Sequence, residues 1–212
     1  MFREMINSKF DIYRRFIKRP VDFILSLVAT IVCSPLLIAI AIIIKLDSKG
    51  PILFIQERVG KNNLKFNIYK FRTMVNNADR LGTGLKTSKN DVRVTKIGNI
   101  LRKTSLDEIP QLLNILKGDM SIVGPRPTVE KVVDQLPKEN RKRHMVRPGV
   151  TGLAQVNGRQ SLSWSEKVKY DLIYVETLTF LVDIKILLKT VFVVFNQEAV
   201  HKEEVSKEFK EL

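Results

Sequence analysis

The chain has 212 residues, of which 44% are hydrophobic and 27% are charged. That composition excludes a disordered or low-complexity chain, and the length suffices for one medium-sized domain with its own core. The single cysteine, Cys33, excludes a disulfide framework and a cysteine-based metal site. The formal net charge of +14 indicates a polyanionic partner, which can be nucleic acid, anionic lipid or a phosphorylated substrate.

An uncharged apolar run spans residues 23–44, with Lys18 and Arg19 before it and Lys45 after it. It is long enough to cross a hydrocarbon core of ~30 Å as one helix. Ser34-Pro35 interrupts it, because proline removes a backbone hydrogen bond, although the serine hydroxyl can satisfy the freed carbonyl. The run alone favours a kinked transmembrane helix, whereas two basic flanks favour a re-entrant hairpin with both ends on one side.

The strand-forming runs 51–58 and 64–71 are separated by a five-residue turn, which predicts a β-hairpin. The polar residues 76–104, in which Gly82 and Gly84 add flexibility, predict a loop. Apolar residues at helical spacing, followed by Gly118, predict a helix over 108–117.

Three further helices are expected in the C-terminal half of the chain. Residues 129–147 predict a basic helix, and residues 165–178 predict a second helix. Residues 180–195 are apolar but carry charges such as Asp183, which favours an interfacial or core helix over a membrane span.

A pair of adjacent carboxylates, Asp107 and Glu108, opens the helix expected at 108–117. Ser105 and Glu108 have the spacing of a capping box, so a purely structural role is open. In the catalytic alternative, the Asp107 carboxylate attacks phosphorus and divides one difficult step into two easier ones. Arg102 and Lys103 suit a polyanionic substrate in that case.

Arg126 lies between Pro125 and Pro127, so it is presented on a stiff backbone. A guanidinium held this way loses little freedom when it clamps a phosphate, although a rigid turn with a solvated arginine is equally compatible. The glycine-rich loop from Arg147 to Arg159 allows a close approach to a ligand, but its spacing is neither that of a P-loop nor that of a dinucleotide fingerprint.

Two other features are less specific. Asp171 and Tyr174 are spaced to lie on one face of the helix expected at 165–178. The histidines His144 and His201 lie among charged residues, which predicts solvated positions for both.

Seven strings, in order and over about residues 18–198, resemble the monotopic phosphoglycosyl transferase family, bacterial sugar transferases that start capsule, exopolysaccharide and glycoprotein glycan assembly. The strings are Lys18-Arg19-Pro20-Val21-Asp22, Ser34-Pro35, Gln56-Glu57-Arg58-Val59-Gly60, Lys70-Phe71-Arg72-Thr73-Met74, Ser105-Leu106-Asp107-Glu108-Ile109-Pro110-Gln111, Gly124-Pro125-Arg126-Pro127 and the loop 147–159.

The resemblance implies a helix-rich α+β fold in three parts. Residues 1–47 are expected to form a basic segment and a re-entrant membrane helix-break-helix that turns at Ser34 and Pro35. Residues 48–198 are expected to form a cytosolic catalytic domain with a β-hairpin and interfacial amphipathic helices, and residues 199–212 a charged tail.

The resemblance also implies transfer of a sugar-1-phosphate from a UDP-sugar to undecaprenyl phosphate at the cytoplasmic face of the bacterial inner membrane. Asp107 is the implied nucleophile and Mg²⁺ ligand, Glu108 its partner, and Arg126 a phosphate-binding residue. The other residues that we assign to substrate or phosphate binding are Lys70, Arg72, Arg102, Pro125, Pro127, Arg147, Arg159 and Asp171. A homodimer is left open, and the sequence does not identify the sugar of the UDP-sugar donor.

Two alternatives compete with this interpretation. A membrane-tethered nucleic-acid-binding protein accounts for the charge and the apolar run, but aromatic residues are not interleaved with the basic ones as single-strand binding needs. A glycosyltransferase that moves only the sugar and releases UDP is disfavoured because the chain contains no Asp-x-Asp motif. We therefore expect no nucleic-acid partner.

Overall fold

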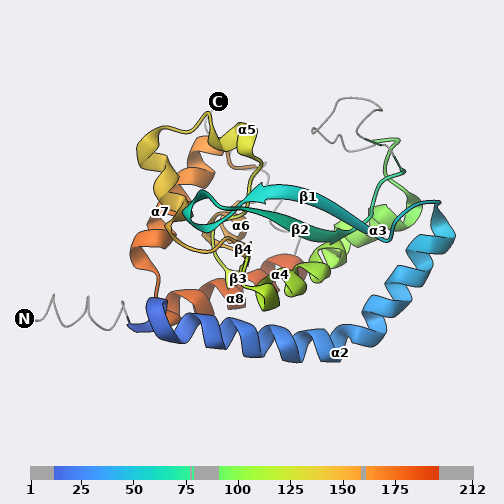
Figure 1. Ribbon diagram of the computed structural model, residues 1–212, viewed down its shortest axis with the longest axis horizontal. Helices are drawn as coiled ribbons and strands as arrows, with labels where there is room; N and C mark the ends of the chain where they lie inside the picture. The colour runs from blue at the N-terminus through green and yellow to red at the C-terminus, as the bar shows by residue number, and fades with distance from the viewer. Residues whose placement is uncertain (1–11, 77, 79–90, 159–160, 196–212) are drawn as a thin grey trace, which may run out of the picture.

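The computed structural model describes residues 12–76, 78, 91–158 and 161–195 (Figure 1). Its elements, in chain order, are η1 (Tyr13–Ile17), α2 (Lys18–Asp47), β1 (Leu53–Val59), η2 (Lys61–Asn63), β2 (Lys65–Phe71), α3 (Lys96–Thr104), η4 (Leu106–Gln111), α4 (Leu112–Lys117), β3 (Ser121–Val123), α5 (Glu130–Val133), η5 (Lys138–Met145), β4 (Gly149–Thr151), α6 (Leu153–Val156), α7 (Trp164–Thr177) and α8 (Phe180–Phe195). The expected helix-rich α+β class is confirmed.

The apolar run forms α2, and with η1 it makes one helix, Tyr13–Asp47, that is long and apolar enough to cross a membrane. We expected two helices separated by a break at Ser34-Pro35. That break is absent, because α2 continues through Pro35 as one helix. Figure 1 shows that the helix bends along its length, as proline causes. The Ser34 hydroxyl donates to the Ile31 carbonyl at 2.8 Å, which is the carbonyl that the missing Pro35 N–H leaves free.

Both ends of α2 are attached to the rest of the protein. At the N-terminal end, the buried Asp22 accepts hydrogen bonds from the Ser121 hydroxyl at 2.6 Å and the Ile122 amide at 3.2 Å. At the other end, Ile40 and Ile44 pack in a buried cluster with Phe71 and Leu101. Most of the large apolar side chains between these two contacts are exposed.

The predicted hairpin is confirmed: β1 and β2 pair antiparallel from Leu53 opposite Phe71 to Val59 opposite Lys65. Its turn is the short η2 helix. The polar stretch that we expected to be loop ends in α3, where the Thr95 side chain caps the helix by accepting from the Gly98 amide. Residues 77 and 79–90 of that stretch lie outside the described part of the chain.

The helix expected over 108–117 begins as the 3-10 helix η4 and continues as α4, ending at Gly118 with a φ of 96°. The continuous basic helix expected over 129–147 is wrong. Only the short α5 and the 3-10 helix η5 form, and Pro137 separates them because its ring cannot continue a helix.

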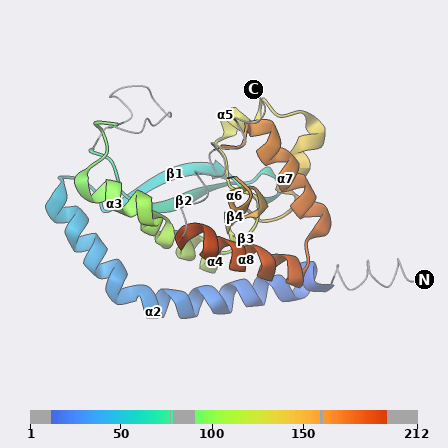
Figure 2. The same cartoon turned by 180° about the vertical axis from the view of Figure 1, so that it is seen from behind.

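The C-terminal helices α7 and α8 agree with the prediction and cover the main core. Tyr174, Val175 and Ile186 are buried there with Tyr13 of η1. In both views α8 lies above the N-terminal part of α2 (Figures 1 and 2). The link between the two is Lys18, whose ammonium lies 2.5 Å from the buried Asp183 carboxylate.

Candidate active site

The two adjacent carboxylates lie in η4, the first turn after α3. Ser105 joins the two helices in a left-handed conformation, with a φ of 58°, and its side chain makes no capping hydrogen bond. The capping-box interpretation is therefore wrong. Asp107 and Glu108 emerge from a tight helical turn packed against β2, and both are partly buried.

Glu108 is held between two cations. Its carboxylate accepts from Lys70 Nζ at 2.6 Å, and from Arg126 Nη2 at 2.5 Å and Nη1 at 3.2 Å. Burial opposes ionisation, but the charges of Arg126 and Lys70 prevail and hold the pKa of Glu108 well below its usual range. Glu108 is thus a fixed negative charge that orients Lys70 and Arg126.

Asp107 lies in a different environment, although it is the next residue. Within the described part of the chain, its carboxylate takes part in neither a hydrogen bond nor an ion pair. Burial, followed by the charge of Glu108, raises the pKa of Asp107 above its usual value, while Lys70, Arg102 and Arg126 act in the opposite sense. Its oxygens are therefore available to an incoming group, in a basic environment that suits a phosphate.

The remaining cations come from separate elements. Lys70 is on β2, and burial followed by the charge of Arg126 lowers the pKa of its ammonium. Arg102 is on α3, where its Nε donates to the Thr73 hydroxyl at 2.8 Å. The charge of Arg126 is stabilised by Glu108, which raises the pKa of the guanidinium.

The loop that carries Arg126 is fixed by close backbone packing. β3 and β4 pair in parallel, with Ser121 opposite Gly149 and Val123 opposite Thr151. A side chain at Gly124, Gly149 or Gly152 would collide with the backbone of the facing segment. The glycine-rich loop does allow a close approach, but its partner is the backbone around Gly124 rather than a ligand.

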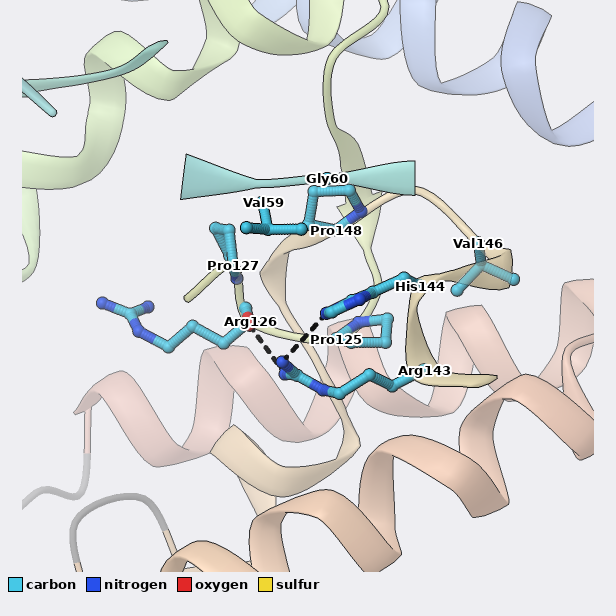
Figure 3. Close-up of a pocket in the computed structure, with 9 residues that line it drawn as sticks. All are labelled: Val59, Gly60, Pro125, Arg126, Pro127, Arg143, His144, Val146 and Pro148. Carbon is cyan, nitrogen blue, oxygen red and sulfur yellow. Dashed lines mark hydrogen bonds between the residues drawn. The ribbon is translucent and has the colours of Figure 1, made fainter. Parts of the chain in front are cut away.

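Arg143, which the sequence did not single out, holds the same loop from behind. Its Nη2 donates to the Arg126 carbonyl at 2.8 Å and to Asp171 Oδ2 at 2.6 Å, and its Nε donates to the same carboxylate oxygen at 2.9 Å. Figure 3 shows Arg143 beneath the small cavity lined by Pro125 and Pro127, while the Arg126 side chain extends away from that cavity. Arg143 is completely buried, and no local pattern distinguishes it from the exposed basic residues around it.

The structure brings Lys70, Arg102, Asp107, Glu108 and Arg126 together, and it places the other predicted binding residues elsewhere. Arg72 is buried and donates to the Ser48 carbonyl at 2.6 Å, at the C-terminal end of α2. Asp171 is buried behind the Arg126 loop, as described above.

Arg147 lies beyond the far end of α4, where its Nε donates to the Gly118 carbonyl at 2.8 Å. Arg159 lies outside the described residues. His144 is not solvated as predicted: it is buried, with Nδ1 2.7 Å from the Asn63 side-chain oxygen.

The donor set of this site fits a magnesium ion only in part. Among the described residues, histidine, cysteine, aspartate and glutamate form no group of three or more that could hold a metal. Glu108 is already occupied by two cations, so Asp107 is the carboxylate left to bind one. Mg²⁺ is commonly held by one or two carboxylates together with substrate phosphates and water, and Asp107 fits that arrangement.

The protein is helix-rich and carries a carboxylate pair surrounded by cations. The same domain packs against α2, which is long enough to cross a membrane. The chain belongs to the bacterial sugar transferase family, which it matches over residues 13–197. This agrees with the resemblance found in the sequence.

Three relatives illustrate the similarity. Over 182 residues the chain is 42% identical to the UDP-N-acetylgalactosamine-undecaprenyl-phosphate N-acetylgalactosaminephosphotransferase of Aeromonas hydrophila, covering 83% of this chain and 43% of that protein. It is 43% identical to the UDP-glucose:undecaprenyl-phosphate glucose-1-phosphate transferase of Klebsiella pneumoniae, covering 82% of this chain and 39% of the relative. It is also 42% identical to an uncharacterized sugar transferase of Bacillus subtilis, covering 80% and 83% of the two chains. The chain thus spans less than half of the first two relatives and most of the third.

Proposed function

We propose that this protein transfers a sugar-1-phosphate from a UDP-sugar to undecaprenyl phosphate, with release of UMP, as the first membrane step in building an exopolysaccharide, capsule or other glycan. The observation that carries the proposal is the contrast within the carboxylate pair. Glu108 is neutralised by Lys70 and Arg126, whereas Asp107 has oxygens available beside the same cations. The names of the Aeromonas and Klebsiella relatives support the substrate class.

The proposed reaction has two steps. In the first, an Asp107 oxygen attacks the β-phosphorus of the UDP-sugar, the bond from that phosphorus to the bridging oxygen breaks, and UMP leaves with that oxygen. In the second, an oxygen of the lipid phosphate attacks the same phosphorus, and the Asp107 carboxylate leaves unchanged. Arg126 and Lys70, oriented by Glu108, are suited to bind the phosphate oxygens.

A magnesium ion bound at Asp107 and at the donor pyrophosphate would supply charge neutralisation for the leaving UMP. The residues of the chain then serve to position the reacting groups. Arg126 acts from a backbone fixed by Arg143, and Lys70 acts from a strand, so both cations are presented with little freedom to lose.

We further propose that α2 enters and leaves the cytoplasmic leaflet from the same side. A straight helix crossing ~30 Å of hydrocarbon would carry one end away from the catalytic body. Contacts of that body with both Asp22 and Ile44 support the re-entrant path instead. The bend of α2 (Figure 1), the proline inside it and its exposed apolar side chains fit a helix that dips into the bilayer.

The test is nucleotide release by the full chain in nanodiscs, with Mg²⁺, undecaprenyl phosphate and a panel of UDP-sugars that includes UDP-glucose and UDP-N-acetylgalactosamine. We expect UMP from at least one donor, and at least a roughly 10³-fold lower rate for Asp107→Asn. Asp134→Asn, which neutralises an exposed carboxylate next to α5, is the matched control and should retain the rate.

The products decide between reaction classes. A burst of UMP without acceptor, stoichiometric with the enzyme, is expected from the two-step scheme, and its absence would count against the aspartyl intermediate. Release of UDP would assign the chain to sugar-only transfer. A full rate in Asp107→Asn would remove Asp107 as the nucleophile.

A further inference from the structure

A second basic cavity lies at the start of α2, away from the carboxylate pair. Its lining contains five basic side chains, which come from η1, α2, the hairpin turn and the segment before β4. They are Arg14, Lys18, Arg19, Lys61 and Arg147. One carboxylate, Asp22, also lines the cavity.

The acidic side chains near this cavity are Asp22, Asp183 and Asp119. Asp119 forms no salt bridge within the described residues, but its charge raises the pKa of Arg19, and its Oδ2 accepts from the Asn114 side-chain amide at 3.3 Å. Asp22 accepts hydrogen bonds from Ser121 and Ile122, and Lys18 is paired with Asp183. Arg19 donates to the carbonyls of Ile115 and Leu116, which are neutral groups. Within the described part of the chain, no salt bridge reaches the four cations Arg14, Arg19, Lys61 and Arg147.

These cations act on one another. Desolvation, followed by the charges of Arg147 and Arg14, lowers the pKa of Lys61. Arg147 is fixed through Nε to the Gly118 carbonyl, and within the described residues its two terminal nitrogens donate no hydrogen bond. Like charges gathered around a cavity in this way are stabilised by a bound anion, and a fixed guanidinium is a suitable phosphate ligand.

Exposed apolar side chains occur in the cavity lining and in the segments that supply the lining residues. Met145 lines it and is 52% exposed. Ile17 precedes the lining residue Lys18, and Phe180 and Leu181 follow the lining residue Leu178 closely; all three are exposed. The exposed apolar surface of α2 begins at the same place. A ligand that carries both a phosphate and hydrocarbon chains would pair with the cations and cover these apolar side chains.

We propose that this cavity binds the phosphate headgroup of an anionic phospholipid, and that it is separate from the site of phosphoryl transfer. Asp107 lies near the beginning of the η4–α4 helical segment, whereas the cavity lies at its end, where Arg147 contacts Gly118. The 3-10 rise of η4 and the α-helical rise of α4 together separate these ends by roughly 19 Å. A phosphate held there is therefore not the one that reacts with Asp107, and the bound lipid anchors the start of α2 at the membrane surface.

The experiment measures the thermal stability of the full chain in a non-ionic detergent during titration with dioctanoyl phosphatidylglycerol. A ligand that binds only the folded state raises the melting temperature, and the stabilisation grows with the logarithm of the ligand concentration divided by its Kd. The test variant is Arg14→Gln/Lys61→Gln, and its matched control is Lys131→Gln/Lys138→Gln, which removes two exposed charges from the region of α5 and η5. Inorganic phosphate and dioctanoyl phosphatidylcholine are titrated in parallel.

We expect phosphatidylglycerol to stabilise the wild type and the control pair equally, and to bind the test variant about 30-fold more weakly. If phosphatidylglycerol raises the melting temperature of the test variant as much as that of the control, the cavity is not the lipid site. If inorganic phosphate stabilises as well as the lipid does, the site binds free phosphate rather than a headgroup. If phosphatidylcholine is as effective, the charge has no role. Should the double variant fail to fold, Lys61→Gln alone repeats the test at an exposed side chain, with a loss of about fivefold.

Discussion

Asp107 and Glu108 are adjacent in the chain, and their surroundings move their pKa values in opposite directions. Lys70 and Arg126 both point at Glu108, which stays ionised, while burial and the charge of Glu108 raise the pKa of Asp107. A carboxylate with a raised pKa is a stronger base and a stronger nucleophile than one held by two cations. The division of roles between the two residues therefore follows from their neighbours.

Replacing Glu108 with Gln should change the pH dependence of the proposed reaction. The substitution removes the negative charge that raises the pKa of Asp107 and leaves Lys70 and Arg126 to lower it. Because the nucleophile must be ionised, activity is lost as the pH falls through the pKa of Asp107, and this acid limb should move to lower pH in Glu108→Gln. The maximal rate should also fall, by about 10² to 10³, because Arg126 and Lys70 lose the group that orients them. Initial rates of UMP release between pH 4 and 8 test this, and an acid limb that stays in place or moves upward would contradict it.

The buried His144 predicts a pH effect on stability instead. Burial, followed by the charges of Arg143 and Arg141, lowers the pKa of His144 to about 4 from its ordinary value of 6.5. Between those values the unfolded chain binds a proton that the folded chain excludes. Stability is therefore fully present above pH 6.5 and declines as the pH falls toward 4, by up to about 3 kcal/mol.

The His144→Gln variant isolates this contribution. Urea unfolding at several pH values between 4 and 7.5 should show a smaller loss of unfolding free energy for the variant than for the wild type. Parallel curves for the two proteins would mean that His144 is not the group responsible.

At the scale of elements, α2 shows how one residue shapes a helix. Pro35 removes the hydrogen bond to Ile31, and the Ser34 hydroxyl takes over that carbonyl at 2.8 Å. The helix can therefore bend without leaving an unsatisfied polar group in an apolar environment. The bend also lets Ile40 and Ile44 reach Phe71 and Leu101 while Asp22 stays bound to Ser121.

Pro35→Ala should straighten α2. A straight helix from residue 24 to residue 46 spans about 33 Å, and the bent one spans less. Spin labels at the exposed positions Ile24 and Leu46, in a Cys33→Ser background, would report the separation by pulsed electron paramagnetic resonance in nanodiscs. We expect a longer distance in Pro35→Ala than in the parent or in the control Leu36→Ala. The same distance in all three would show that Pro35 does not cause the bend.

At the scale of the whole molecule, a buried polar cluster joins the start of α2 to the C-terminal helices. Asp183 accepts from Lys18 at 2.5 Å, from Tyr13 at 2.7 Å and from Tyr174 at 2.8 Å. The Tyr174 hydroxyl also lies 3.0 Å from the Val123 carbonyl, next to the loop that carries Arg126, so its single proton is shared between that carbonyl and Asp183. The position of α2 is thus connected to the site through satisfied hydrogen bonds.

Lys18→Met should weaken this connection. It leaves the buried Asp183 carboxylate without its cation, and breaking a buried pair by removing one partner costs about 3 to 5 kcal/mol. Unfolding free energies should show that loss, and hydrogen exchange should rise first in residues 13–26. Arg15→Met, which neutralises an exposed arginine on the same helical segment, serves as the control. A loss of stability as small as that of the control would mean that the pair does not hold α2 in place.

The features predicted well from sequence were those set by local chemistry. The hairpin, the C-terminal end of α4, helix α7, the apolar helix and the Ser34 hydroxyl that takes the role of the missing Pro35 N–H depend on residues close together in the chain. The sequence and the family resemblance also named the carboxylate pair and the cations Lys70, Arg102 and Arg126, which the structure places close together; their roles stay a prediction. Helix α3 was missed because its short apolar pattern lies in a polar stretch, and its Gly98 packs against the Thr73 backbone.

By itself, the sequence determined the hairpin, the long apolar helix, the two C-terminal helices, the excess of positive charge, and the carboxylates and cations from which the site is proposed. Only the tertiary structure decided which cations face Asp107, because Lys70, Arg102 and Arg126 come from three different elements. It also decided that Arg143 and His144 are buried, that Arg72 and Arg147 lie away from the carboxylates, and that Asp171 supports Arg126 from behind. The physical reason is that burial and charge pairing depend on contacts between residues distant in the chain, whereas periodicity and turn chemistry depend on neighbours.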